Sequence, residues 1–429
     1  MRAHDARVAR DAQATLGAAG VVAQALAGPY RPAPEGEDVA IIPVVDPDAA
    51  NSLASALQSS PQAPLAVLAG YSQCNAPPFA LDAPTIFQGA ISLDAPPKLA
   101  NAQVKACLRL AVARDERERR GATVAEHGLA PPKALEPRPL KVLYIGAPNA
   151  MFLTLERAFT ERGGGVTAAF SSYAGFDHLH DDVFDAVVLN GVQDSATALA
   201  LCSALRRNAS LCLLPTMFIA AQGDAKTADT AIERGAASVV VATEPYEANL
   251  GWLFEAIRQD RKRRAVEHDL RGFRDLVSEP RTGLFKRGAF DAHLMRLAVD
   301  HHASGRPLSL AALRVLPAHG ARQPSEDDWK RGFSEISSLA ARLIRECDSG
   351  AAIGQDFIAV AMPATRLAGA RRTAERIASV AECTAFASGE GGVGPLVFEQ
   401  SAVELQPGES GAGMLARALH ALNLESIPA

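Results

Sequence analysis

The chain has 429 residues, of which 48% are hydrophobic and 21% are charged, and its formal net charge is −5. This length allows roughly two to four domains with cores of their own, and the charge argues against a protein that coats nucleic acid. The six cysteines form no CxxC pair and no cluster with histidine, so they imply reduced thiols and neither a zinc site nor a disulfide framework. No signal peptide and no apolar run near the ~20 residues of a membrane helix is present, so we expect a cytoplasmic protein without a membrane segment.

Residues 1–125 predict a first α/β domain with a parallel sheet, although few turn signals separate its elements. Short apolar runs of strand length lie at 39–42, 65–68 and 89–93, and a helix is expected over 103–119. A usable first strand is missing, because the chain begins almost directly in a helix. Residues 126–139 form a proline-rich linker, which we expect to be semi-rigid and extended.

Residues 140–258 show the clearest alternation of elements. The predicted strands are 140–145, 166–170, 184–189, 211–220 and 237–242, and the predicted helices are 150–161, 195–207, 225–234 and one that starts near Tyr246. Strands that alternate with helices of about 10–15 residues predict a doubly wound parallel sheet that is covered on both faces.

Residues 259–279 predict a connecting helix, and a third domain follows at 280–429. The apolar side chains of this helix recur at i, i+4, i+7 and i+11, and the stripe consists of Val266, Leu270, Phe273 and Val277. The basic run Arg261-Lys-Arg-Arg264 fits either nucleic-acid contact or the solvated face of a helix. The solvated face is favoured, so no nucleic-acid partner is expected.

Four segments of the third domain follow the order and spacing of one known family. Arg281-Thr-Gly-Leu-Phe-Lys-Arg287 is similar to the LTGLxNR opening of GGDEF domains, and Gly354-Gln-Asp-Phe-Ile358 stands in the place of the GGDEF signature. Residues 305–313 match the strand before the metal site, and residues 374–376 match a later helix. The whole order resembles the PleD type of response regulator, in which two receiver domains precede a GGDEF diguanylate cyclase. The resemblance implies two flavodoxin-like receiver folds and a nucleotidyl-cyclase-like α+β fold.

The catalytic chemistry of a cyclase is missing from the matching positions. Such an enzyme holds divalent metal on carboxylates, which are the ligands that hard cations prefer. The two metal aspartates of the family fall on Arg314 and Leu316, and its guanine-reading residues fall around Arg322 and Lys330. The degenerate signature consists of Gly354, Gln355, Asp356, Phe357 and Ile358. We therefore expect no catalytic residue, no metal and no cyclase activity, and the surviving Asp356 is the one sign of the alternative, a residual cyclase.

The candidate ligand site lies at the end of a predicted helix. Its apolar stripe is Ile336, Leu339, Ala340 and Leu343, and Ser349-Gly350 stops the helix. Arg345 and Asp348 therefore project from its C-terminal end into a turn, at the RxxD position of the family's inhibitory site for cyclic di-GMP. Guanine offers N7 and O6 as acceptors, which suit a guanidinium group, and its N1–H and amino group are donors that suit a carboxylate.

Two arginines on the next helix support the same ligand. Arg372 and Arg376 lie four residues apart, and the resemblance implies that arginines at these positions complete the site. Arginine both pairs with phosphate and stacks on flat rings. The alternative is an exposed salt bridge between Arg345 and Asp348, worth at most about 1 kcal/mol. Asp300 stands where the family supplies a further arginine, which argues against a ligand dimer that crosslinks two sites.

Both receiver-like domains lack the chemistry of phosphorylation. Receivers hold Mg²⁺ on an acidic pair and phosphorylate an aspartate, but here Gly146-Ala147 replaces the pair and Asn190 replaces the acceptor. The usual lysine before a proline appears as Glu244-Pro245. In the first domain Pro43 stands at the acceptor position, and Asp46 is a displaced candidate without an acidic pair before it. We expect these domains to supply surfaces for dimerisation and protein binding.

The chain resembles the PopA type of cyclic di-GMP effector. In both, two receiver domains without phosphorylation chemistry precede a GGDEF domain that lacks catalytic residues but keeps the ligand site. This resemblance implies a homodimeric receptor at the cell pole, which acts as a proteolytic adaptor in the bacterial cell cycle. The implied partners are RcdA, CtrA and the ClpXP protease. Two alternatives remain, the residual cyclase and a purely structural dimerisation module that binds no nucleotide.

Overall fold

The computed structural model describes most of the chain, in two compact units. The described residues are 2–3, 13–14, 16–18, 26–27, 39–59, 63–72, 77, 86–242, 247–321, 323–384, 387 and 395–425. Unit 1 consists of Met1–Ala111 and Glu136–Arg264, and unit 2 consists of Val112–Leu135 and Ala265–Ala429. Residues 112–125, which the sequence assigned to the first domain, thus belong to the same unit as the third domain.

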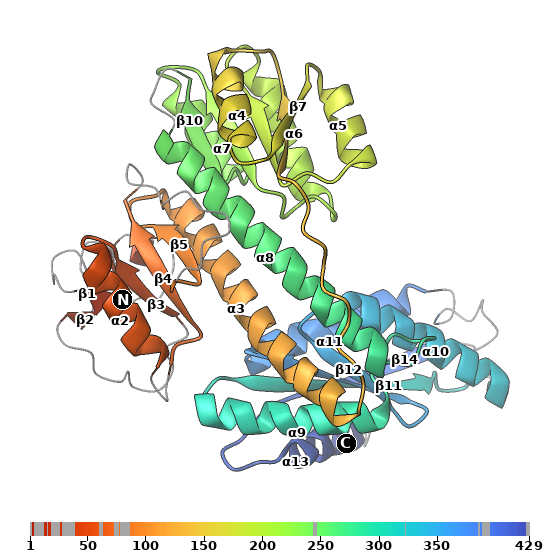
Figure 1. Ribbon diagram of the computed structural model, residues 1–429. Helices are drawn as coiled ribbons and strands as arrows, with labels where there is room; N and C mark the ends of the chain where they lie inside the picture. Colours follow the sequence, from red (N-terminus) through yellow and green to blue (C-terminus); the bar gives the residue numbers. More distant parts are fainter. Residues whose placement is uncertain are drawn as a thin grey trace. The chain divides into compact units, whose positions relative to one another are not determined.

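The first part of unit 1 contains a small parallel sheet (Figure 1). Its strands and helices are β1 (Arg2–Ala3), β2 (Leu26–Ala27), β3 (Val39–Pro43), α2 (Pro47–Gln58), β4 (Ala66–Tyr71), β5 (Gly89–Ser92) and the start of α3 (Pro97–Glu126). The strands β3, β4 and β5 pair in parallel in this order, which confirms the three predicted strands. At the expected place of a first strand the structure has the two-residue β1, which pairs with β2 in a separate sheet and not with β3, β4 or β5. A strand of two residues leaves no apolar run to detect.

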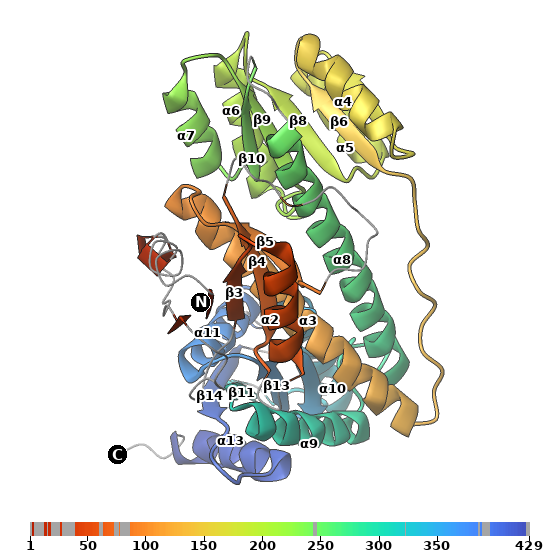
Figure 2. The ribbon, with the colours of Figure 1, turned by 60° about the vertical axis from the view of Figure 1, so that its left-hand side comes forward.

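The second part of unit 1 is a five-stranded parallel sheet with helices on both faces (Figure 2). The elements are β6 (Lys141–Ile145), α4 (Ala150–Thr160), β7 (Gly165–Ala169), α5 (Ser172–Asp181), β8 (Ala186–Asn190), α6 (Ser195–Arg207), β9 (Thr216–Ala220), α7 (Ala225–Glu233), β10 (Ser238–Val241) and the start of α8 (Glu247–Val277). The strand order β10-β9-β8-β6-β7 is that of a doubly wound flavodoxin-like sheet. One core cluster lies under α4 and α8, and another lies under α5, α6 and α7. The five predicted strands are present, but β9 begins at Thr216 and not at residue 211, because the chain forms a turn before it.

One helix of this sheet, α5, is missing from the sequence prediction. It begins at the N-cap Ser171, whose hydroxyl accepts the N–H of Ala174. Gly175 is its one buried residue, and Tyr173 is 84% exposed. Because the helix buries so little, it has no apolar stripe from which a period of 3.6 residues could be detected.

The sheet of unit 2 is antiparallel and follows a β-α-β-β-α-β order. Its elements are α9 (Arg287–Ser304), β11 (Leu308–Pro317), α10 (Glu326–Leu343), β12 (Ser349–Ile353), β13 (Phe357–Pro363), α11 (Leu367–Glu382), β14 (Leu396–Glu404) and α13 (Gly411–Glu425). The strand order is β12-β13-β11-β14, and all neighbours are antiparallel. Alternate residues of β11 enter two separate cores, one under α9 and α13 and one under α10 and α11. The predicted fold class, two parallel α/β domains followed by an α+β domain, is confirmed.

The two longest helices contribute to unit 2 through their C-terminal parts. The predicted apolar stripe of α8, Val266, Leu270, Phe273 and Val277, is buried throughout. Phe273 and Val277 join the core under α9 together with Val124 of α3. The helix α3 continues to Glu126, beyond the predicted end at residue 119. Unit 2 therefore has four helical segments on this face of its sheet, two of which come from outside the predicted third domain.

The basic run of α8 is bound to carboxylates of unit 1. Arg261 and Arg264 both reach Asp185, whose side chain is fully buried, and Arg263 and Arg264 reach Asp260. These pairings support a structural role for the run. Among the described residues, no helix combines the length and apolarity needed to cross a membrane.

Candidate functional site

Arg314 stands where the resemblance to GGDEF domains led us to expect a metal aspartate. On β11, Arg314 stands opposite Phe357 of β13 and Glu399 of β14. Its Nε is 3.5 Å from Oδ2 of Asp356, its Nη1 is 3.7 Å from Oε2 of Glu399, and its guanidinium carbon lies 5.3 Å from the centre of the Phe357 ring. A fixed positive charge between two carboxylates repels a divalent cation and neutralises the groups that would bind it.

A hollow lies beside Asp356, the carboxylate that Arg314 approaches. An open hollow of about 500 Å³ lies between the end of β11, the start of α10 and the β12–β13 turn. Its described lining includes Leu316, Trp329, Gln355 and Asp356. Trp329 also donates its indole N–H to the carbonyl oxygen of Gln355, at 3.0 Å. The predicted guanine-reading position Lys330 is exposed, and Arg322 lies outside the described residues.

Arg314→Asp should convert this centre into a metal site. The change places a third carboxylate beside Asp356 and Glu399, which repel one another until a cation binds. We expect millimolar Mn²⁺ to raise the Tm of this variant by roughly 3 °C or more and to leave wild type unchanged. Thermal melts with and without metal test this, with Arg314→Ala as the control that removes the charge but adds no ligand. Equal shifts in wild type and in Arg314→Asp would contradict the account.

The predicted ligand turn lies between the end of α10 and the start of β12. Arg345 and Asp348 contact each other there, which is the pairing that the sequence analysis gave as the alternative to a ligand site. The backbone N–H of Arg345 donates to Oδ2 of Asp348 at 3.0 Å, and Nε of Arg345 lies 3.8 Å from the same oxygen. The side chain of Arg345 is 53% exposed, whereas that of Asp348 is 1% exposed. The turn therefore offers an open guanidinium group beside a carboxylate that is covered in the free protein.

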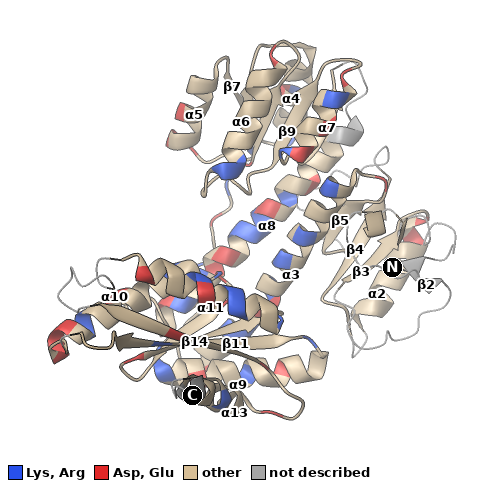
Figure 3. Cartoon of the chain, turned by 180° about the vertical axis from the view of Figure 1, so that it is seen from behind, with Lys and Arg blue, Asp and Glu red and all other residues tan. Residues whose placement is uncertain are grey.

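The two arginines of α11 lie on one exposed face of that helix, whose basic residues are visible in Figure 3. Arg376 donates from Nη2 to the carbonyl oxygen of Leu343, at 2.8 Å, which brings it to the last turn of α10. Arg372 lies one turn earlier and, within the described part of the chain, makes no hydrogen bond or ion pair. The structure thus gathers Arg345, Asp348 and Arg376 around one helix end, with Arg372 on the adjoining surface.

The covered position of Asp348 changes its acidity. Burial raises its pKa to about 6, although the charges of Arg345 and Arg120 and the hydrogen bond from the Arg345 N–H act in the opposite direction. A carboxylate that is costly to ionise where it lies gains from any new hydrogen-bond donor. Partner groups that donate two hydrogen bonds, as a guanine edge does, would supply that gain.

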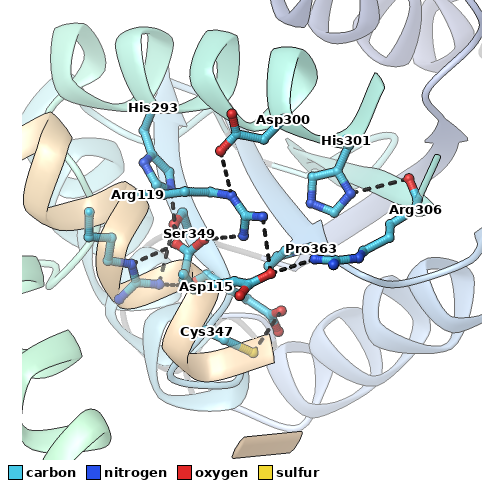
Figure 4. A network of polar contacts seen from close by, with 12 residues as sticks. Asp115, Arg119, His293, Asp300, His301, Arg306, Cys347, Ser349 and Pro363 are labelled. Atoms are coloured by element: carbon cyan, nitrogen blue, oxygen red, sulfur yellow. Dashed lines mark hydrogen bonds and ion pairs between the residues drawn. The ribbon is translucent and has the colours of Figure 1, made fainter. Parts of the chain in front are cut away.

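A buried polar network behind the turn was not predicted from the sequence (Figure 4). Its centre is Glu116 of α3, which is fully buried. Oε1 of Glu116 accepts from Nε of Arg120 at 2.9 Å and lies 2.8 Å from Nε2 of His293 and 3.4 Å from the hydroxyl of Ser349. Burial alone would raise the pKa of Glu116, but His293, Arg120 and Arg119 together lower it to about 2. Residues 112–126 are rich in charge, so their sequence indicates a solvated helix and hides these contacts.

A second group of ion pairs continues the network along α3. Figure 4 shows Arg119 directed toward Asp300 of α9 and toward Asp115, and Arg306 directed toward Asp115 from the other side. The distance from Nε of Arg119 to Oδ2 of Asp300 is 2.9 Å. Asp300, where the resemblance led us to expect a further arginine, is therefore engaged with α3 of its own chain.

In the second receiver-like domain, the positions expected for the acidic pair and for the acceptor contain neutral groups. Asn190 donates to the carbonyl oxygen of Ala147 at 2.6 Å and accepts the N–H of Val192, and Gly146 has a φ of 128° beside it. In the first domain Asp46 is exposed and caps α2, since its carboxylate accepts the N–H of Asp48 at 3.0 Å. Glu244 and Pro245 lie outside the described residues.

Comparison with known proteins finds similar folds for parts of the chain. No family model matches, and no curated protein matches. The GGDEF domain of DgcB from Caulobacter crescentus, solved in complex with c-di-GMP, is 22% identical over 35% of this chain and 86% of its own, with a TM-score of 0.29. A putative response regulator from Chloroflexus aurantiacus is 18% identical over 28% of this chain and 98% of its own, with a TM-score of 0.26. The FimX GGDEF domain from Pseudomonas aeruginosa is 17% identical over 34% and 91%, with a TM-score of 0.28.

Proposed function

We propose that this protein is a receptor for cyclic di-GMP that has no cyclase activity. The observation that carries the proposal is the gathering of Arg345, Asp348 and Arg376 at the C-terminal end of α10. The exposed guanidinium of Arg345 would take N7 and O6 of a guanine, and the carboxylate of Asp348 would take its N1–H and amino group. Arg372 and Arg376 would pair with the phosphates.

Ligand binding in this scheme requires one local rearrangement. The carboxylate of Asp348 must turn outward from its bond with the Arg345 N–H, because its side chain is 1% exposed in the free protein. The burial that raises its pKa makes the inward position unfavourable for the ionised form. The backbone of the turn and the side chain of Arg345 keep their positions.

The absence of catalysis is the second part of the proposal. It is supported by Arg314, whose guanidinium lies within 4 Å of both Asp356 and Glu399. Incubation with GTP and Mg²⁺ followed by chromatography should yield no cyclic di-GMP. Formation of the product by pure protein would overturn this part and favour the residual cyclase.

The cellular role that we propose rests on the resemblance to the PopA type of effector. In this role the protein acts as a homodimer at the cell pole and, with cyclic di-GMP bound, connects RcdA and CtrA to the ClpXP protease. Co-purification of the purified proteins with and without cyclic di-GMP tests it. Binding of RcdA that does not depend on the ligand would contradict the proposed adaptor mechanism.

Arg345→Ala should weaken the binding of cyclic di-GMP about 10- to 100-fold, because one bidentate contact with guanine contributes about 1–3 kcal/mol. Isothermal titration calorimetry measures the change. Arg342→Ala is a matched control, since Arg342 is an exposed arginine on the last turn of α10. Equal affinities of wild type and Arg345→Ala would refute the proposed ligand site. If wild type does not bind cyclic di-GMP at all, the alternative of a purely structural dimerisation module is favoured.

A further inference from the structure

Arg120 of α3 lies directly behind the ligand turn. Its Nη2 donates to the backbone carbonyl oxygen of Asp348 at 2.8 Å and lies 3.3 Å from the hydroxyl of Ser349. Its Nη1 donates to the carbonyl oxygen of Leu270 on α8 at 3.3 Å. The side chain is 1% exposed, so it holds the turn from within the unit and does not reach its open surface.

The guanidinium group of Arg120 is itself held in one orientation. Nε donates to Glu116, which is also bonded to His293, and the guanidinium carbon lies 5.4 Å from the centre of the Phe285 ring. Arginine presents its donors in a rigid planar fork, so a fixed Nε also fixes the direction of the other two nitrogens. The position of the Asp348 carbonyl is thus determined by a residue 228 positions earlier in the chain.

A second contact holds the same turn from α8. Nη1 of Arg274 donates to Oε2 of Glu346, at 3.2 Å, and Glu346 lies between the two ligand residues. The segments of α3 and α8 that belong to unit 2 therefore both contact the four-residue turn.

We propose that Arg120 is a positioning residue for the cyclic di-GMP site, and that residues 112–126 of α3 are part of that site's architecture. The inference rests on the proposed function. While the carboxylate of Asp348 turns outward to the ligand, Arg120 keeps the backbone of Asp348 in place. The turn then already has the backbone conformation in which Arg345 and Asp348 contact the two edges of one guanine. Because no backbone ordering is needed on binding, the entropic cost of binding is lower.

This arrangement couples the ligand to α3 in both directions. If Arg120 favours the binding-competent turn, bound ligand must favour the bonded state of Arg120 by the same factor, because coupling between two sites is reciprocal. Ligand binding should therefore slow the hydrogen exchange of backbone amides in residues 112–126.

The test uses the full chain and cyclic di-GMP. Arg120→Met keeps much of the buried side-chain volume but removes every donor, and it should weaken binding about tenfold or more. Arg120→Lys keeps the charge beside Glu116 but loses the fork, so its loss of affinity should be smaller. This variant carries the test if Arg120→Met does not fold. Met414→Ala removes a fully buried side chain of α13 from the core under α9, and it controls for loss of stability alone. Titrations are made at a temperature at which every variant is folded.

The outcomes separate the inference from the proposed function. Weaker binding by both Arg120 variants with normal binding by Met414→Ala supports the positioning role, as does ligand protection of 112–126 that disappears in Arg120→Lys. Equal affinities of wild type and Arg120→Lys, with protection unchanged, overturn the inference and leave the receptor intact. No binding by wild type overturns the proposed function, and the inference falls with it.

Discussion

Glu116→Ala should destabilise unit 2 by about 3–5 kcal/mol, the range seen when one partner of a buried ion pair is removed. Glu116 is fully buried, and its loss leaves Arg120 and His293 without their shared acceptor. Urea denaturation followed by tryptophan fluorescence measures the effect. In a Trp252→Phe background the signal comes from Trp329, which lies in unit 2.

Two further variants test the same network. Glu118→Ala, at an exposed position on the same helix, should change stability by at most about 0.5 kcal/mol. The double change Glu116→Leu with Arg120→Met should recover much of the loss, because replacing both partners by apolar groups leaves no uncompensated charge. A loss in Glu116→Ala as small as in Glu118→Ala would mean that the network contributes no net stability.

The pH dependence of the same group has a definite sign. The pKa of Glu116 in the folded protein is about 2, below its ordinary value of 4.5. Its contribution is therefore complete above pH 4.5 and is lost as the pH falls toward 2. The difference in stability between wild type and Glu116→Ala should shrink over this range.

Asp348→Asn should weaken the binding of cyclic di-GMP about 10- to 100-fold and should remove its pH dependence. A hydrogen bond to a charged acceptor contributes about 1.5–3 kcal/mol, and an amide presents a donor where guanine also presents one. In wild type, the pKa of Asp348 is about 6, and the proposed contact with the guanine donors requires the ionised form. Affinity should therefore fall about tenfold between pH 7.5 and pH 5. Calorimetry across this range measures both effects.

The stability of the free protein should change with the opposite sign. Burial raises the pKa of Asp348 from 3.8 to about 6. Its contribution to stability is thus complete below pH 3.8 and is lost as the pH rises through 6. Asp348→Asn has no such loss, so its Tm relative to wild type should increase from pH 4 to pH 7.5.

A pH-independent affinity of wild type for cyclic di-GMP would show that the carboxylate of Asp348 does not contact the ligand.

The core of unit 1 could be predicted from its sequence for a simple physical reason. Strands of a parallel sheet are buried on both faces, so β6, β8 and β9 are continuous apolar runs that stand out from their surroundings. The helix α5 lacks this signal because it buries one glycine. The strand β1 has two residues and therefore lacks it as well.

The candidate ligand turn could be predicted as a turn after a helix, but its surroundings could not. Arg345 and Asp348 follow from a short motif at a helix end, which local sequence contains. The burial of Asp348 and the contact from Arg120 depend on α3, more than 200 residues earlier. Hydrophobic periodicity gives no sign of that contact, because Glu116, Arg119 and Arg120 are polar residues that are buried by pairing with one another.

The membership of residues 112–135 in unit 2 also limits how this chain can change in evolution. Multidomain proteins can exchange whole domains when each domain carries its complete core. Here Val124 belongs to the core of the last domain, and Glu116 and Arg120 bind groups on α9 and β12. Replacement of the N-terminal domain by an unrelated one would remove part of the C-terminal domain as well. The first and last thirds of the sequence must therefore be inherited together and must accept substitutions as coordinated pairs.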